Sequence, residues 1–125
     1  MSIEKKFETL DKKLYCQQIT PDQFCARNNS EWENMWNRIC PAYLADSPLP
    51  KIDFDKEMVL GVFLGTKPSS GYNIEILHLL EKDNCLEVYV KETKPTFGFF
   101  YASVLTQPYH IIKTDKVDKD IKLVR

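Results

Sequence analysis

The sequence has no long apolar segment and almost no excess of charge of either sign. Its 17 basic residues nearly balance 18 acidic ones along 125 positions, which gives a formal net charge of −1 at pH 7. A chain this close to neutral has no broad positive field that would attract phosphate backbones or anionic lipid. The charge balance therefore argues against nucleic acid as a partner.

The lack of a long apolar segment also bears on membranes. The longest apolar run, 58–64, is far shorter than the roughly 20 residues of a membrane-spanning helix. The N-terminus starts with polar residues such as Ser2, Glu4 and Lys5 and lacks the apolar core of an export signal. We expect no transmembrane segment, and a cytoplasmic location unless a leader has been removed.

A metal-ligand pattern is missing as well. Cys16, Cys25, Cys40 and Cys85 form no C-x-x-C pair and do not cluster with either histidine, so we expect neither a zinc site nor another cofactor. We interpret them as buried free thiols. One alternative stays open: Cys16 and Cys25 flank the turn-like Thr20-Pro21, and a hairpin there could bring them within disulfide reach in an oxidising compartment.

What is present is the composition of one ordinary globular domain. Hydrophobic residues make up 43% and charged residues 28% of the chain, which suits a single hydrophobic core at this length. Apolar runs bounded by turn residues predict strands at 7–10, 23–27, 58–64, 72–80, 86–91, 103–106, 109–114 and 120–124. We therefore predict one domain over residues 1–125 of a mostly β (α+β) class, a small antiparallel β-sandwich or rolled sheet.

Two of these strands carry further expectations. Residues 58–64 are apolar without alternation, which is typical of a central strand covered on both faces. In 72–80 the apolar residues alternate, so His78 is expected on the same face as Ile74 and Ile76. A turn at 82–84 would join this strand to the next one as an antiparallel pair.

One short helix is expected to flank the sheet near residues 31–39. Ser30 can cap this helix and Glu33 can reach back to the cap, the arrangement called a capping box. Four apolar residues recur at helical spacing and form one stripe, Trp32, Met35, Trp36 and Ile39. The gain from burying two indoles favours packing on the core over an exposed binding stripe.

The most unusual segment is the turn at 65–72. Gly65, Pro68 and Gly71 indicate special backbone geometry at a tight, exposed turn. The segment lacks the Lys-Ser/Thr end of a phosphate-binding loop, leads into a strand and has no Gly-x-Ser-x-Gly elbow. We predict that it binds a partner through Lys67, Pro68, Ser69, Ser70, Gly71 and Tyr72.

A second loop and a later proline turn complete the candidate rim. Residues 94–101 place four aromatic side chains around Gly98, more apolar content than a loop normally exposes to water. The favoured interpretation is a flap folded onto the domain, and the alternative is an exposed aromatic contact surface. The loop and the turn at 107–108 add Phe97, Gly98, Pro108 and Tyr109 to the predicted partner-binding residues.

A small-ligand or enzymatic role is the competing hypothesis. Ser70 could act as a nucleophile with His78 or His110 as its base. However, His78 belongs to an apolar strand face, and the sequence supplies no orienting carboxylate or oxyanion site for His110. We therefore predict a protein that is not an enzyme and has no catalytic residues.

These motifs resemble the PrcB C-terminal domain family, named for an accessory subunit of a bacterial protease complex. The resemblance spans roughly Phe7 to Lys116. It is carried by Ser30-Glu31-Trp32 with Trp36, Ile52-Asp53-Phe54, Glu57-Met58-Val59-Leu60, Gly65-x-Lys67-Pro68-Ser69-Ser70-Gly71-Tyr72-x-Ile74 and Thr106-Gln107-Pro108-Tyr109. It implies a non-enzymatic domain of the cell envelope or periplasm that binds or stabilises a protease or another envelope protein.

A looser likeness is to chagasin-type inhibitors of cysteine proteases. Such inhibitors present three loops at one end of a β-sandwich, and segments 68–72, 95–98 and 107–108 occur here in the same order. This likeness implies a protease inhibitor. Both resemblances imply a protein-interaction domain whose partner is a protease. The contact would be made through the loops around Ser69, Phe97 and Pro108.

Overall fold

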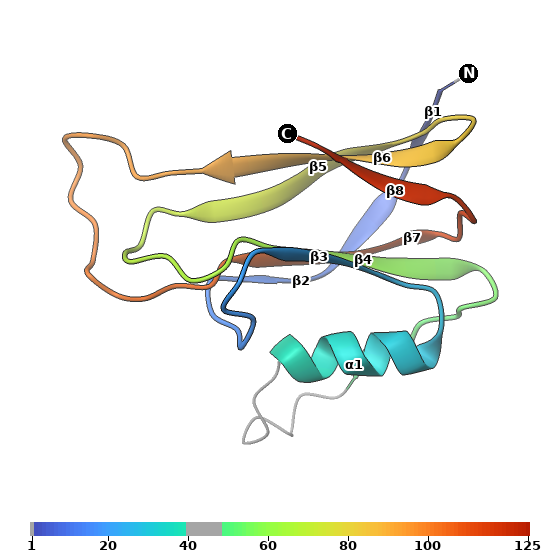
Figure 1. Cartoon of the computed structure of the whole chain (residues 1–125), viewed down its shortest axis with the longest axis horizontal. Coiled ribbons are helices and arrows are strands. Elements are labelled where there is room, and N and C mark those ends of the chain that lie inside the picture. Colours follow the sequence, from blue (N-terminus) through green and yellow to red (C-terminus); the bar gives the residue numbers. More distant parts are fainter. Residues whose placement is uncertain (1, 40–48) are drawn as a thin grey trace.

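The computed structural model describes residues 2–39 and 49–125, and there the strands form two packed sheets with one helix outside them (Figure 1). The first sheet has the order β1 (Ile3–Lys5), β5 (Asn73–Glu81), β6 (Cys85–Thr93) and β8 (Asp120–Val124). The second has the order β2 (Phe7–Lys13), β7 (Tyr109–Asp115), β4 (Glu57–Phe63) and β3 (Asp22–Ala26). Helix α1 (Asn29–Ile39) packs against the second sheet. The predicted mostly β sandwich with one short helix is confirmed.

Neighbouring strands run antiparallel except at one edge. β5 and β6 form the predicted antiparallel pair, joined by the turn after Glu81. β8 returns to lie parallel to β6, with Cys85 opposite Asp120. The C-terminal strand thus becomes the edge of the first sheet.

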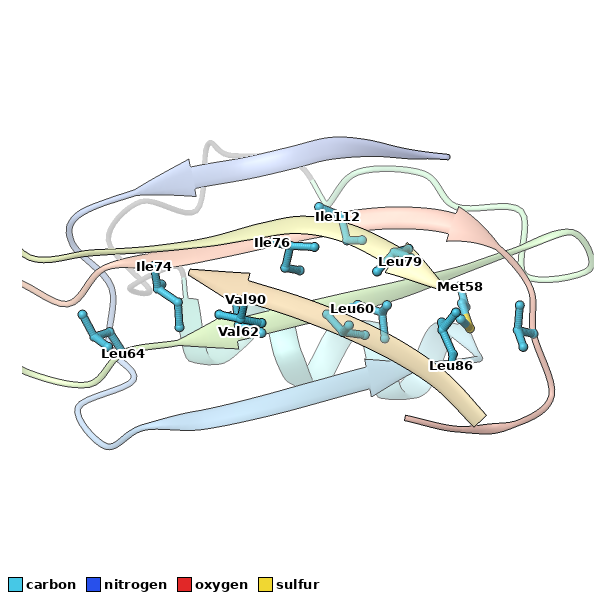
Figure 2. Packing of buried hydrophobic residues seen from close by; sticks show 12 residues of the cluster. Met58, Leu60, Val62, Leu64, Ile74, Ile76, Leu79, Leu86, Val90 and Ile112 are labelled. Carbon is cyan, nitrogen blue, oxygen red and sulfur yellow. The ribbon is translucent and has the colours of Figure 1, made fainter. Parts of the chain in front are cut away.

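β4 is apolar on both of its faces, so it contributes to two buried clusters, one between the sheets and one under α1. Met58, Leu60 and Val62 join the buried side chains of β5 and β6 (Figure 2). Val59 and Phe63 belong to the second cluster, which packs under α1. The expectation of a central strand covered on both faces is confirmed.

The N-terminal strands connect the two sheets along one side. β1 pairs with β5 in the first sheet and β2 pairs with β7 in the second, with Lys6 between them. The extended chain therefore crosses from sheet to sheet between β1 and β2 (Figure 1). This crossing closes one side of the sandwich, whereas the opposite side ends in β3 and β8.

β5 contains a β-bulge that the sequence pattern did not predict. Its register with β6 shifts between Ile76 and His78, so Leu77 is the additional residue. Beyond the bulge the alternation changes phase: Leu79 is fully buried, whereas His78 is half-buried against Tyr89 on the outer face. The predicted common face of His78 and Ile76 is therefore wrong.

Helix α1 begins at Asn29, earlier than predicted, because its cap is Asn28 and not Ser30. Asn28 Oδ1 accepts a hydrogen bond from Glu31 N–H at 2.8 Å, and Glu31 Oε1 accepts one from Arg27 N–H at 2.9 Å. The predicted apolar stripe does face the core. Within it Trp32, Met35 and Ile39 are buried, while Trp36 is half-buried.

The cysteines do not form the hairpin that the sequence left open. β2 pairs with β7 and β3 pairs with β4, so the segments around Cys16 and Cys25 lie towards opposite edges of the second sheet. Cys16, Cys25 and Cys85 are free thiols, and Cys40 lies outside the described residues. The alternative of a Cys16–Cys25 bridge is therefore wrong.

Candidate functional site

Three loops meet at one end of the sandwich, which we call the loop end: residues 14–21, 64–72 and 94–108. Backbone hydrogen bonds join them. Thr66 N–H donates to Ile19 O at 2.9 Å, and Gln107 N–H donates to Leu14 O at 2.6 Å. The sequence predicted the second and third loops as a rim, but it gave no sign that the first loop joins them, because that contact is set by the pairing of distant strands.

The turn at 65–72 is held along its length by the chain that precedes β7. Lys67 and Thr106 exchange backbone hydrogen bonds of 2.8 and 2.9 Å. Ser70 N–H donates to Ala102 O at 3.0 Å, and Ala102 N–H donates to the Ser70 hydroxyl at 2.9 Å. The predicted strand at 103–106 is therefore wrong, since this irregular pairing replaces it.

Gly71 allows the long loop to pack closely on the turn. Its φ is +94°, and a Cβ atom there would lie 2.6 Å from the ring of Tyr101. The hydroxyl of Tyr101 accepts a hydrogen bond from Thr96 N–H at 3.0 Å. Tyr101 thus connects the turn to the base of the loop.

The outer part of the 94–108 loop carries an aromatic tip, Phe97, Phe99 and Phe100. These residues have relative solvent accessibilities of 102%, 71% and 98%. Phe99 N–H donates to Thr96 O at 3.3 Å and Gly98 has φ +92°, as in a type II turn. The favoured interpretation of a folded-in flap is therefore wrong, and the alternative, an exposed aromatic surface, describes the loop. Figure 1 shows the loop reaching beyond the ends of the strands.

Two predicted rim residues lie inside the domain. Pro108 is buried, and Tyr109 is buried within the cluster under α1, where its hydroxyl donates to Asp11 Oδ2 at 2.7 Å. These residues support the loop end from below, and a partner reaching the surface would not touch them in this conformation. Lys67 and Tyr72 are half-buried, with the ammonium group 5.6 Å from the ring centroid.

The loop end is poor in charge and rich in exposed apolar side chains. Its three segments contain Lys67 and Lys94 but no Asp or Glu, in a chain that is 28% charged. Of the exposed large hydrophobic residues in the described chain, most lie here: Leu14, Tyr15, Ile19, Phe97, Phe99, Phe100, Val104 and Leu105. Charge depletion together with aromatic enrichment is the composition of the centre of a protein interface.

The residues of the enzymatic hypothesis lie on separate elements. Ser70 is held in the turn, whereas His78 lies on the outer face of β5. His110 is 3% exposed, between the sheets, where its Nδ1 accepts from Ile76 N–H at 3.0 Å and Thr9 Oγ1 lies 2.8 Å from its Nε2. Burial, and secondarily the charge of Lys12, lowers the pKa of His110.

Comparison with protein families gives a match that runs from β4 to the end of β7 and so includes the turn and the long loop. Residues 58–115 match the PrcB C-terminal family. Over these residues the match confirms the resemblance that the sequence motifs suggested, and the matched segment contains both the Gly65 to Tyr72 turn and the aromatic tip. The Ser30 and Ile52 motifs precede the matched residues. Neither the search of curated proteins nor the search of solved structures gave a match.

The described part of the chain lacks two other features, a membrane-spanning helix and a metal-ligating cluster. Residues 2–39 and 49–125 include no helix with the length and apolar character needed to cross a membrane. In the same residues there is no group of three or more His, Cys, Asp or Glu side chains that could hold a metal ion.

Proposed function

We propose that this chain is a non-enzymatic protein-interaction domain of the PrcB type that binds a protein partner through its loop end. The observation that carries the proposal is the exposed aromatic tip on a surface nearly free of charge. The family match supports a PrcB-like domain. From the family's name we further propose a protease, or a protein assembled with one, as the partner.

The exposed aromatic tip is costly to leave in water. Moving one Phe side chain from water into an apolar environment contributes roughly 1.5–3 kcal/mol. The neighbouring Val104 and Leu105 extend the apolar surface. Exposed aromatic clusters of this kind mark contact sites, since interface hot spots are dominated by large side chains that enter pockets on the partner.

The base of the loop is ordered before any partner arrives. Tyr101 packs on Gly71, and the hydrogen bonds between Ser70 and Ala102 fix the loop to the turn. A preformed loop loses less conformational entropy on binding than a free one. The Ser69 carbonyl also accepts a hydrogen bond from the Thr106 hydroxyl at 3.1 Å. Ser69 and Ser70 therefore act mainly by holding the base of the loop, and the phenylalanines supply the contact surface.

The inhibitor form of this proposal is less well supported. The chagasin-like order of loops includes Gln107-Pro108 as a third contact segment, but Pro108 and Tyr109 are buried. Of the three chagasin-like segments, the 65–72 turn and the aromatic tip remain accessible at this end. We therefore favour association with a protease complex over inhibition of its active site.

The test is capture of a partner followed by direct binding measurements. The tagged chain is used to isolate associated proteins from its own host, and the purified partner is titrated against wild type and against Phe97→Ser with Phe100→Ser. A loss of at least about tenfold in affinity is expected, because hot-spot aromatics often contribute more than 1.4 kcal/mol each. Leu77→Ser, at an exposed apolar position of β5, is the matched control and should bind as wild type does.

Two outcomes would contradict the proposal. If the phenylalanine variant and the Leu77→Ser control bind the partner equally well, the loop end is not the contact surface. If the wild type finds no partner but sediments with lipid vesicles, and the phenylalanine variant does not, the tip contacts a membrane surface and not a protein.

A further inference from the structure

The two sides of the sandwich differ in how their edges are covered. On one side, β1 and β2 form an extended segment that pairs with β5 and then with β7. On the other side, β3 is the last strand of the second sheet and pairs with β4, and β8 is the last strand of the first sheet. An edge strand presents unpaired N–H and C=O groups to which another extended chain can pair.

The orientation of backbone groups along β3 identifies its free edge. Gln23 N–H donates to the carboxylate of Asp22 at 2.8 Å, so it is turned away from β4 and satisfied by a local side chain. Groups of alternate residues in a strand point to the same side. Cys25 N–H and C=O therefore share this outward direction and are available for pairing with an added strand.

Hollows lie on both faces of this edge. The inter-sheet hollow, about 210 Å³, is mainly apolar and is lined by Cys25, Leu60, Val62, Ile121 and Leu123, among others. The helix-side hollow, about 180 Å³, lies between β3 and α1 and is lined by Phe24, Met35, Glu31, Asn34 and Arg38, among others. The Arg38 guanidinium lies over the Phe24 ring, 4.4 Å from its centroid. Because successive side chains of a strand point to opposite faces, a strand beside β3 would direct alternate side chains into the two hollows.

We propose that the free edge of β3 binds an extended segment of a partner protein by strand addition. Main-chain hydrogen bonds to the C=O of Gln23 and to the N–H and C=O of Cys25 hold the segment, and the two hollows select its side chains. Apolar side chains enter the inter-sheet hollow. Side chains with an apolar stem and a polar head, such as Gln or Lys, enter the helix-side hollow and reach Glu31 or Asn34. This site is distinct from the loop end and goes beyond the proposed function.

A strand fits this position better than a lipid or another hydrocarbon does. Any occupant of the inter-sheet hollow removes water from the β3 edge beside it. A hydrocarbon would leave the backbone groups of Cys25 without partners, which is unfavourable for buried polar groups. An extended peptide replaces the lost water with main-chain hydrogen bonds, and it also explains why hollows are present on both faces of one strand.

The experiment uses random linear peptides of about 12 residues, a length sufficient to span an edge strand. The peptides are displayed on phage and selected for binding to the full chain. Enriched peptides should alternate apolar and polar residues. In NMR titrations the backbone amides of β3 should shift most, and hydrogen exchange at the Cys25 amide should slow. Methylating single peptide N–H groups should weaken binding by about tenfold at every second position, because only those groups pair with β3.

Variants of β8 test whether the selected peptides bind at the inter-sheet hollow or elsewhere on the surface. Leu123→Arg places a long charged side chain at the inter-sheet hollow and should weaken the selected peptides by at least about tenfold. Lys122→Arg, at the adjacent exposed position of the same strand, should have no effect. Hydrogen exchange of the free variants establishes that each one folds as the wild type does.

Several results would overturn the proposal. They are a selection that enriches no peptide, amide shifts that map away from β3, N-methylation without a period of two, or unchanged binding to Leu123→Arg. Displacement of the bound peptide by a fatty acid with loss of the β3 amide shifts would identify a hydrocarbon site instead. Phe97→Ser with Phe100→Ser should leave the binding of the selected peptides unchanged. Failure of strand addition at β3 is therefore distinguishable from failure of the proposed function at the loop end.

Discussion

Gly71 and Gly98 have the same backbone conformation and opposite surroundings. Their φ angles are +94° and +92°, in the region that residues with a side chain rarely adopt. A Cβ on Gly71 would lie 2.6 Å from the Tyr101 ring, whereas a Cβ on Gly98 would meet nothing within 4 Å. The pair therefore separates the effect of backbone strain from the effect of crowding.

We predict that Gly98→Ala lowers the free energy of unfolding by about 1 kcal/mol, and that Gly71→Ala lowers it by about 2–4 kcal/mol. Both variants bear the conformational cost, but Gly71→Ala must also displace Tyr101 and so disturb the loop base. Urea denaturation of the two variants measures the difference. Equal losses would show that the contact between Gly71 and Tyr101 contributes nothing to stability.

His110 links the two sheets through its neutral ring. Because Nδ1 accepts a hydrogen bond from Ile76 N–H, the ring proton resides on Nε2 and is donated to Thr9 Oγ1. Protonation of Nδ1 would turn it into a donor that faces the Ile76 N–H donor, and it would also place a charge in a buried site. The groups with charge near it are Lys12, which lowers its pKa further, and Glu75, which partly compensates.

The lowered pKa of His110 predicts a loss of stability in mild acid. The unfolded chain binds the proton near the ordinary value of 6.5, whereas the folded chain resists it. Stability is therefore full above that value and decreases as the pH falls through it towards the lowered folded pKa. Urea denaturation between about pH 8 and about pH 5 should show this decrease in the wild type and a smaller one in His110→Gln. Identical slopes would contradict the assignment.

At the scale of elements, α1 is fixed to the sheet mainly by its first tryptophan. Trp32 is fully buried, and its indole N–H donates to Pro50 O at 2.9 Å. Trp36 is half-buried beside it, with ring centroids 5.5 Å apart. The sequence pattern predicted the stripe correctly but did not rank its members, because spacing alone does not say how much of each ring the sheet covers.

We predict that Trp32→Ala destabilises the fold by about 3–5 kcal/mol and that Trp36→Ala costs less, about 1–3 kcal/mol. The first change leaves a cavity and an unpaired carbonyl at Pro50, while the second removes contacts that are partly open to water. Chemical denaturation followed by far-UV circular dichroism measures both. A larger loss for Trp36→Ala would mean that the helix is rotated about its axis relative to this packing.

The strands were predictable where local pattern and tertiary contact agree. β4, β6, β7 and β8 follow from apolar runs between turn residues. β5 was predicted with the wrong phase after Leu77, because a single bulged residue leaves no local signature in the sequence. Residues 103–106 look like a strand, yet they pair with the 65–72 turn, a contact that depends on chain segments far apart.

At the scale of the whole molecule, the sequence located the candidate site but not its character. The turn at 65–72 was identifiable from its glycines and proline, and the family match covers it. The exposure of the aromatic tip could not be predicted, because a loop rich in phenylalanine usually packs on its own domain. The free edge of β3 and its two hollows could not be predicted either, since they arise from how the two sheets end on one side and not from any sequence motif.

The exposure of the tip yields a prediction that needs no partner. Phe97 and Phe100 make almost no buried contact in the domain, so Phe97→Ser with Phe100→Ser should change the free energy of unfolding by less than about 0.5 kcal/mol. The same change should raise solubility and remove concentration-dependent association, because it disperses the largest exposed apolar cluster. Urea denaturation and size-exclusion chromatography over a range of concentrations measure the two effects. A loss above about 1 kcal/mol would mean that the loop folds onto the domain in solution, and the contact surface would then have to lie elsewhere.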